Sequence, residues 1–436
     1  MLNKILFKQK DNSALIVFRI IFGLLCFLES VGAIITGWVK NTMVEPEFTF
    51  SFIGFEWLQP LPGNWMYVYY CIMGLFGLFI MLGYRYKWST ITFAIMWTAT
   101  YLMQKSSYNN HYYLLVLLSF IMVIQPANKY LSIDSRRNPS IVSHSMPRWC
   151  TLLFIVQMFI VYTYGSINKI YPDWLNLDVM KILMQGKSHY YLVGDILQER
   201  WLQYFLAYGG IFFDGLVIPL LLIKKTRKPA FFASIFFHLF NSLIFQVGIF
   251  PYLSLAFTLF FFSQVTIHRL FLKRKPFYDK AEVIIPKYAR LFKILLIFYL
   301  IVQIVLPIRH HFIKGDVFWT EEGHRLSWRM MLRTKYGYAN YKITDMETGQ
   351  TENIRLKDYL SEKQIRSATT KPDVIWQFAQ RLKAIYLKSG KNISVFADCK
   401  VSLNGKDFKP LVDPNVDLAN VPWEPLKHSY WILPEN

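Results

Sequence analysis

The stretch VYTYGSINKIYPDW (Val161–Trp174) ends a long apolar run in a single lysine. The residues from Cys150 up to this stretch are almost wholly apolar, which predicts a membrane-spanning helix. Lys169 comes just before the helix breaker Pro172. Two interpretations of this lysine stay open. Its ammonium reaches the lipid headgroups, or the amine is desolvated and acts as a base at neutral pH.

The rest of the chain predicts a membrane protein as well. It is 54% hydrophobic over 436 residues, and its apolar runs of about 16–25 residues are too long for an ordinary soluble domain. We expect a polytopic α-helical membrane domain of about nine spans in residues 1–308 and a small α+β domain in residues 309–436. The candidate spans are 14–37, 64–83, 88–104, 108–125, 148–170, 201–223, 229–246, 249–265 and 291–308, and 229–246 with 249–265 can instead form a re-entrant pair.

The net charge of +20 lies mainly in short loops between the apolar runs. With a cytoplasmic N-terminus, the inner segments carry 20 Lys and Arg residues and the outer loops 5. This bias predicts that orientation, with the C-terminal domain extracytoplasmic. It also argues against nucleic acid as a partner, because the charge is explained by membrane topology.

The C-terminal region has the patterns of a mixed fold. YKITDMETGQTENIRL predicts a hairpin with its turn at METG, and a second hairpin is expected around Asn404–Gly405. Between them, Pro372–Ser389 has the spacing of an amphipathic helix that ends at Gly390.

Ionisable side chains inside apolar runs are costly and usually face a protein interior or a cavity. We expect Arg19 and Asp214, both placed in the cytoplasmic half, to form a structural ion pair. Glu29 can accept a hydrogen bond from Lys169 or cap a neighbouring helix, and the sequence does not decide between these roles. Lys169 and His238 are further ionisable residues within the runs.

Two further groups of polar residues are candidate site residues. His238 and Asn241 lie three apart on one helix face, where they either line a cavity or are satisfied packing residues. Asn109, Asn110 and His111 stand at the start of a span, where ordinary capping by asparagine is the alternative to a functional role.

No serine nucleophile elbow, phosphate-binding glycine loop, HExxH or CxxC occurs in the chain, and no metal-ligand spacing is present. This argues against a hydrolase, an ATPase, a zinc protease and a thiol oxidoreductase. What remains is a lysine base, histidines and amides in an aromatic-rich membrane cavity. Such a site suits an apolar cofactor that arrives laterally from the bilayer.

Several stretches, taken together and in order, resemble one family. They are VFRIIFG (Val17–Gly23), LPGNWMYVYY (Leu61–Tyr70), NNHYYL (Asn109–Leu114), INKIYPDW (Ile167–Trp174), FHLFNSLIFQVGIFPY (Phe237–Tyr252) and LSWRMM (Leu326–Met331). The chain resembles the vitamin K-dependent γ-glutamyl carboxylases and their microbial relatives, the horizontally transferred transmembrane domain (HTTM) group. The resemblance extends from about Ala14 to Trp431.

The resemblance implies a peptidyl-glutamate 4-carboxylase, a carbon–carbon lyase-type enzyme that couples epoxidation of a reduced quinone to addition of CO2 to glutamate. Its cofactor is reduced vitamin K or menaquinol, O2 and CO2 are co-substrates, and a glutamate-containing peptide or protein is the partner. Lys169 matches the base that starts the reaction. His111 matches the histidine assigned to carbanion or CO2 handling, with Asn110 beside it. His238 and Asn241 match polar positions that line the family's cavity.

Other expectations are less specific. Lys406 and Lys409 can attract an acidic peptide, or they are simply a solvated basic hairpin. The chain ends soon after Trp431, whereas animal carboxylases continue, and it lacks their cysteine pair between membrane and lumenal parts. Recognition of a propeptide is therefore not implied. Two alternative functions stay open: a quinol-oxidising or epoxidising enzyme without carboxylation, and a non-enzymatic membrane binding module.

Overall fold

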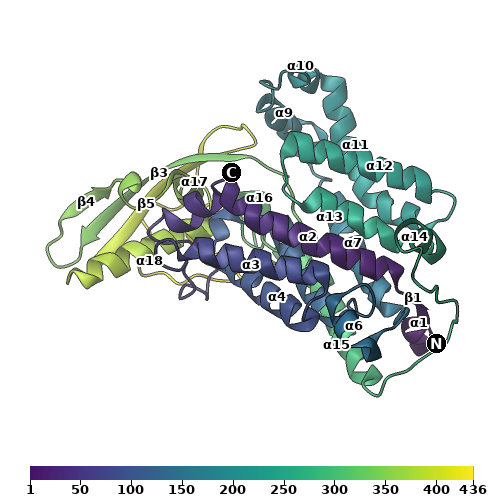
Figure 1. The fold of residues 1–436 in the computed structure, drawn as a ribbon. Coiled ribbons are helices and arrows are strands. Elements are labelled where there is room, and N and C mark those ends of the chain that lie inside the picture. Colours follow the sequence, from purple (N-terminus) through teal and green to yellow (C-terminus); the bar gives the residue numbers. More distant parts are fainter. Residues whose placement is uncertain (436) are drawn as a thin grey trace.

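The computed structural model describes residues 1–435 and places a bundle of helices beside a small antiparallel sheet (Figure 1). We call the end of the bundle nearest the sheet the sheet end. Each predicted span corresponds to a helix. The bundle helices are α2 (Ser13–Ile35), α3 (Trp65–Leu82), α4 (Tyr86–Met103), α5 (Asn110–Ile124), α7 (Trp149–Ile167), α11 (Arg200–Leu222), α12 (Arg227–Phe240), α13 (Phe250–Phe257) and α15 (Ala289–Ile308).

Shorter elements connect these helices. They are α1 (Leu2–Phe7), α6 (Ile133–Arg137), α8 (Pro172–Leu175), α9 (Asp178–Gln185), α10 (Gly194–Gln198), α14 (Gln264–Phe271) and the two-stranded sheet of β1 (Gln9–Asp11) with β2 (Ser145–Pro147).

Within the described residues, six helices are long and apolar enough to cross a membrane, or seven if the pair Phe250–Phe260 and Gln264–Phe271, bent by 119°, counts as one span. The predicted number of about nine spans is therefore not confirmed. Two bundle helices fall short for clear reasons. Helix α4 carries Lys87 and four threonines, and α5 has only 15 residues.

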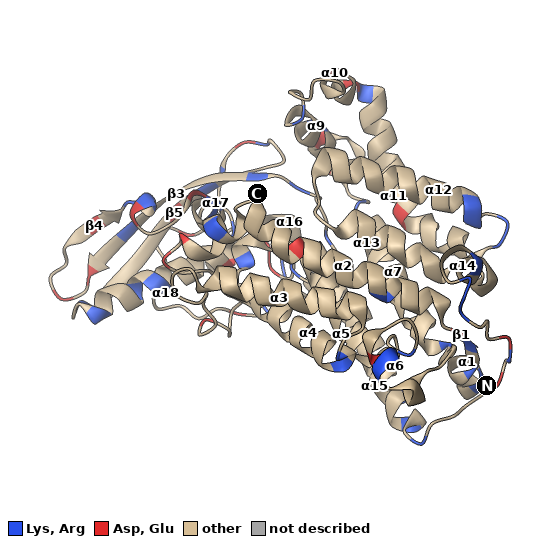
Figure 2. Cartoon of the chain, viewed as in Figure 1, with Lys and Arg blue, Asp and Glu red and all other residues tan. Residues whose placement is uncertain are grey.

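The distribution of charge fits a membrane location for the bundle. Lys, Arg, Asp and Glu gather at its two ends and over the C-terminal region, while the bodies of the helices are nearly free of charge (Figure 2). Many apolar side chains of α15 face outward, among them Phe298 and Leu291, each more than half exposed. In lipid such a surface needs no protein partner.

Helices α2 and α3 are in close contact because glycines lie where they cross. A Cβ atom on Gly77 would lie 2.7 Å from the backbone nitrogen of Phe27, and one on Gly23 would lie 2.7 Å from the carbonyl oxygen of Gly77. Both distances are too short for real side chains. Small residues of this kind let membrane helices approach backbone to backbone.

The C-terminal region forms a four-stranded sheet in the order β4-β3-β5-β6. Strand β3 (Lys335–Asp345) pairs with β5 (Ile393–Leu403) along its whole length, and β4 (Thr351–Ile354) and β6 (Lys409–Pro410) flank them. Helix α18 (Pro372–Lys388) packs on this sheet through Phe378, whose ring lies 5.0 Å from that of Tyr341. Both predicted hairpins and the predicted helix are confirmed. Helices α16 (Val317–Thr320) and α17 (Glu362–Ala368) complete the region.

A buried cluster of charges joins this region to the bundle. Asp373 on α18 lies 2.6 Å from the amine of Lys105, in the α4–α5 connection, and 2.5 Å from the guanidinium of Arg325. Burial alone would raise the pKa of Asp373, but Arg325 and Lys105 outweigh it and hold that pKa below its ordinary value. Burial lowers the pKa of Lys105 to about 8 in spite of the ion pair.

We expect Asp373→Asn to lower the free energy of unfolding by about 3–5 kcal/mol at pH 7, because it leaves two buried cations without their carboxylate. The ionised carboxylate contributes fully above its ordinary pKa of 3.8 and loses its contribution as the pH falls through its lower folded-state pKa. Denaturant unfolding followed by tryptophan fluorescence measures the change. The control is Asp358→Asn, at an exposed position of the same region. Equal stability of the two variants would contradict the prediction.

Candidate functional site

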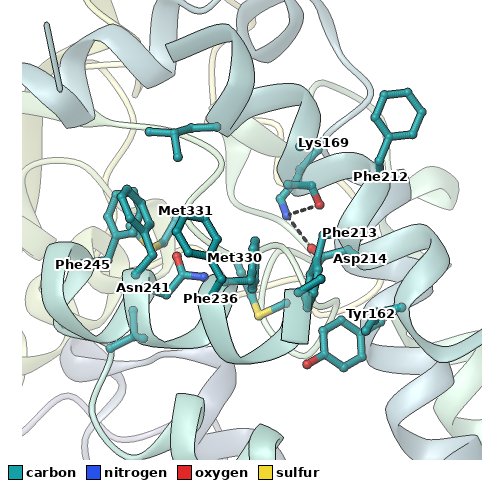
Figure 3. A pocket seen from close by; sticks show the side chains of 18 of the residues that line it. Tyr162, Lys169, Phe212, Phe213, Asp214, Phe236, Asn241, Phe245, Met330 and Met331 are labelled. Carbon is teal, nitrogen blue, oxygen red and sulfur yellow. Dashed lines mark hydrogen bonds and ion pairs between the residues drawn. The ribbon is translucent and has the colours of Figure 1, made fainter. Parts of the chain in front are cut away.

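A cavity of about 440 Å³ lies in the bundle between α7, α11, α12 and α13, towards the sheet end. Most of its wall is aromatic or aliphatic (Figure 3). The polar side chains in the wall are few and come from several segments of the chain. They are His111, Tyr162, Lys169, Asp214 and Asn241.

Lys169 forms an ion pair with Asp214 in the wall of this cavity (Figure 3). The lysine follows the end of α7 and is 9% exposed, and Asp214 on α11 is 5% exposed. The same amine lies 3.5 Å from the carbonyl oxygen of Gly210 and 5.8 Å from the ring centre of Trp174. Carboxylate, carbonyl and aromatic face all favour the charged amine.

The prediction of an ion pair between Arg19 and Asp214 was wrong, because Asp214 pairs with Lys169. Arg19 donates instead to the carbonyl oxygen of Leu131 at 2.6 Å. Asp214 lies level with the end of α7, as two contacts show. The hydroxyl of Ser166 donates to the carbonyl oxygen of Ile211 at 2.9 Å. A Cβ on Gly165 would lie 3.1 Å from the Asp214 carboxylate. Helix α11 therefore extends about 16 Å beyond the end of α7, at 1.5 Å per residue. Counting depth from the start of α11 placed Asp214 too far from Lys169.

Glu29, the other acid considered for Lys169, lines a separate small cavity with Tyr70 and Tyr112. Asp214 rather than Glu29 is thus the partner of the lysine. Among residues 1–435, no group of three or more His, Cys, Asp and Glu side chains is placed to hold a metal ion. Cys26, Cys71, Cys150 and Cys399 are all free.

The three polar residues at the start of α5 have different surroundings. His111 lines the cavity, where its ring stacks on Phe250 with 4.2 Å between ring centres. Asn109 caps the helix by accepting from the backbone N–H of Tyr112 at 2.7 Å, as the capping alternative predicted. Asn110 donates to the carbonyl oxygen of Arg329 at 3.0 Å and so holds a loop of the C-terminal region.

His238 and Asn241 differ in their distance from the cavity. Asn241, at the start of the π-helical turn η4 (Asn241–Phe245), lines it directly. His238 is buried behind Tyr162, whose hydroxyl lies 2.8 Å from its Nε2 atom. This histidine therefore contacts a wall residue, Tyr162, and belongs to the supporting structure.

The loop Leu326–Met331 brings the C-terminal region to the cavity, because Met330 and Met331 form part of its wall. Leu326, Trp328 and Met331 have φ values of 62°, 57° and 53°. Such values are uncommon for side-chain-bearing residues and mark a loop held by its surroundings. Neither this loop nor Tyr162 was among the predicted site residues, although the LSWRMM stretch was a signal for the loop.

The basic residues of the second hairpin lie away from the cavity wall. Lys406 pairs with Asp173 at 2.9 Å and lies 3.7 Å from Glu435, and Lys409 donates to the backbone oxygen of Glu435 at 2.7 Å. The Lys406 side chain is still 48% exposed. Attraction of an acidic peptide by these lysines stays a prediction.

Two protein families match the chain. Residues 7–265 match the HTTM domain, and residues 288–436 match the lumenal domain of vitamin K-dependent gamma-carboxylase. The second match begins before α15, so the predicted domain boundary at residue 308 stays a prediction. No solved structure matches the chain. With the first match covering more than half of its residues and the second most of the rest, the chain belongs to the vitamin K-dependent gamma-carboxylase family.

Proposed function

We propose that this chain is a membrane-embedded, quinol-dependent peptidyl-glutamate 4-carboxylase with its active site in the cavity of Lys169 and His111. One observation carries the proposal. The two residues that match the family's catalytic positions are far apart in the sequence, yet both line a single apolar cavity. The family membership supports a carboxylase-type enzyme and a vitamin K hydroquinone as its cofactor.

The cavity fits a lipid-soluble quinol in size and lining. Its volume of about 440 Å³ falls within the range of ligand pockets, roughly 300–1,000 Å³. Phe213 and Phe237, stacked with 3.9 Å between ring centres, offer an aromatic wall. Phe212 and Phe236 line the cavity and are each 63% exposed on the surface of the bundle. A gap between α11 and α12 is therefore the proposed lateral opening to the bilayer.

The residues of the cavity suit the proposed reaction. A reduced quinone supplies, with O2, the strong base that removes a γ-proton from glutamate, because no protein side chain is basic enough. Lys169 accepts the hydroxyl proton of the bound quinol when its amine is in the neutral form. His111, fixed on Phe250, faces the same space and acts on the glutamate carbanion or on CO2. The apolar walls exclude the water that would consume the base.

The proposed orientation places the sheet end outside the cytoplasm and the N-terminus inside, as the charge bias of the loops predicts. The glutamate peptide then reaches the cavity from the sheet end, past Met330 and Met331. The C-terminal region supplies both of these residues, which supports a role for it in admitting the peptide.

The test is incorporation of labelled bicarbonate into a short glutamate peptide by purified protein supplied with reduced vitamin K or menaquinol and O2. We expect label that requires the quinol. Lys169→Ala and His111→Ala should each lower it by about 10²–10⁴-fold, the usual contribution of a proton-transfer residue. Lys181→Ala and His189→Ala are matched controls at exposed positions and should keep wild-type activity.

The outcomes separate the alternatives. Quinone epoxide that depends on Lys169 without label in the peptide would replace the proposal by a quinol-oxidising enzyme. If neither epoxide nor labelled peptide forms with either quinol, the remaining interpretation is a non-enzymatic membrane module that uses the same fold.

A second prediction tests the lateral opening. Ala233 on α12 lines the cavity and is exposed on the bundle surface, so Ala233→Trp should narrow the gap between α11 and α12. We expect the KM for the quinol to rise by about tenfold or more, which corresponds to roughly 1.4 kcal/mol, with an unchanged KM for the peptide. The control is Phe232→Trp, at the adjacent exposed position. An equal effect of both variants would place the opening elsewhere.

A further inference from the structure

Asp214 pairs directly with Lys169, although the proposed reaction gives it no role of its own. The pair lies in the wall of an apolar cavity, and its two side chains are 11% and 5% exposed. The other titratable side chains lining the cavity are His111 and Tyr162, and neither is negatively charged at neutral pH in its ordinary state. The Asp214 carboxylate is therefore the countercharge that keeps an ammonium stable there.

The groups around the Lys169 amine also favour its charged form. Lys169 faces the carboxylate of Asp214, the carbonyl oxygen of Gly210 and the ring of Trp174. All three attract a cation, and none donates a hydrogen bond to the lone pair of a neutral amine. Without the carboxylate, an ammonium in an apolar cavity would be costly, and a lysine placed there would shed its proton.

A neutral amine would react with CO2 in a site that uses CO2. Its nitrogen lone pair attacks the carbon of CO2, a C–N bond forms and the electrons of one C=O π bond move onto oxygen to give a carboxylate. The nitrogen gives up a proton to a base of the medium, such as bicarbonate. The product is a lysine carbamate, which has lost its basic lone pair. An ammonium has no lone pair and cannot react in this way. CO2 is apolar and enters membrane cavities freely, so exclusion of water gives no protection.

We infer that Asp214 keeps Lys169 protonated in the resting protein and thereby protects the base from carbamylation by CO2. This inference rests on the proposed function for its source of CO2. When a hydroxyl donor occupies the cavity, the proton moves from Lys169 Nζ to Asp214 Oδ2, and Lys169 then takes the hydroxyl proton. The pair gains one positive charge and the ligand one negative charge, so the cavity stays neutral. Asp214 is a positioning residue that controls when Lys169 becomes a base.

The experiment measures carbamate on Lys169 directly, without turnover. Protein is equilibrated with ¹³C-bicarbonate at neutral pH without quinol, carbamates are trapped by alkylation with a trialkyloxonium salt, and the peptide containing Lys169 is quantified by mass spectrometry. Wild type is compared with Asp214→Asn, which removes the charge, and with Asp214→Glu, which keeps it. The exposed Lys181 serves as an internal standard in each sample.

We expect at least about tenfold more carbamate on Lys169 in Asp214→Asn than in wild type or Asp214→Glu, with equal labelling of Lys181. The Lys169 signal should vanish in Asp214→Asn/Lys169→Arg, which has no amine to react. Equal labelling of Lys169 in wild type and Asp214→Asn would overturn the inference. So would wild-type labelling of Lys169 well above that of the exposed Lys181, a result that does not depend on the folding of any variant.

The same wild-type preparation is assayed for label in the glutamate peptide, so the two proposals fail separately. Peptide label together with a carbamylated Lys169 in the resting protein would overturn only the role of Asp214. No peptide label would reject the carboxylase, while protection of Lys169 would still report on the ion pair.

Discussion

The cavity depends on a loop of the C-terminal region that the ends of the bundle helices hold in place. Asn110 and Asn168 donate to the carbonyl oxygens of Arg329 and Ser327, at 3.0 Å each, and the hydroxyl of Tyr108 accepts from the backbone N–H of Leu326 at 2.7 Å. These bonds satisfy backbone groups that would otherwise be buried without partners. They also hold three residues of the loop at positive φ. The two methionines then complete a wall that the bundle alone would leave open, so the two regions form one site.

Buried charges reinforce this junction. The cluster around Asp373 joins the two regions through Lys105. Within the C-terminal region, Glu321 pairs with Arg333 and lies 3.6 Å from Lys335, and these three side chains are at most 16% exposed. Burial outweighs the attraction of Glu321 and lowers the pKa of Lys335 to about 8. Such pairs add little net stability compared with apolar packing, but breaking one is costly. The Asp373 cluster penalises any other placement of the C-terminal region on the bundle, because Lys105 belongs to the bundle. The Glu321 pairs join the segments on either side of the loop.

The sequence predicted the parts of this structure that depend on local pattern. The apolar runs predicted the bundle helices, and alternating apolar residues followed by turn residues predicted both hairpins. Lys169 and His111 do line one cavity, as the polar residues near the predicted outer face suggested. Asp214 was predicted to form an ion pair with Arg19, because its depth in the membrane was counted from the start of its apolar run. The protrusion of α11 beyond α7 comes from tertiary contacts such as that between Ser166 and Ile211, which leave no periodic signal in the sequence.

The cavity combines two requirements that oppose each other. A strong base survives only where water is excluded, and an apolar wall excludes water. The same wall makes an isolated charge costly, so a lone lysine in it would be an uncharged and reactive amine. An ion pair reconciles the two, because it is neutral as a whole and still contains a transferable proton. A Cβ on Gly165 would lie 3.1 Å from the Asp214 carboxylate, closer than an ordinary contact, so α7 packs directly against that pair. In the proposed reaction the packing of α7 on α11 is thus part of the chemistry, since it sets Asp214 beside Lys169 before any ligand arrives.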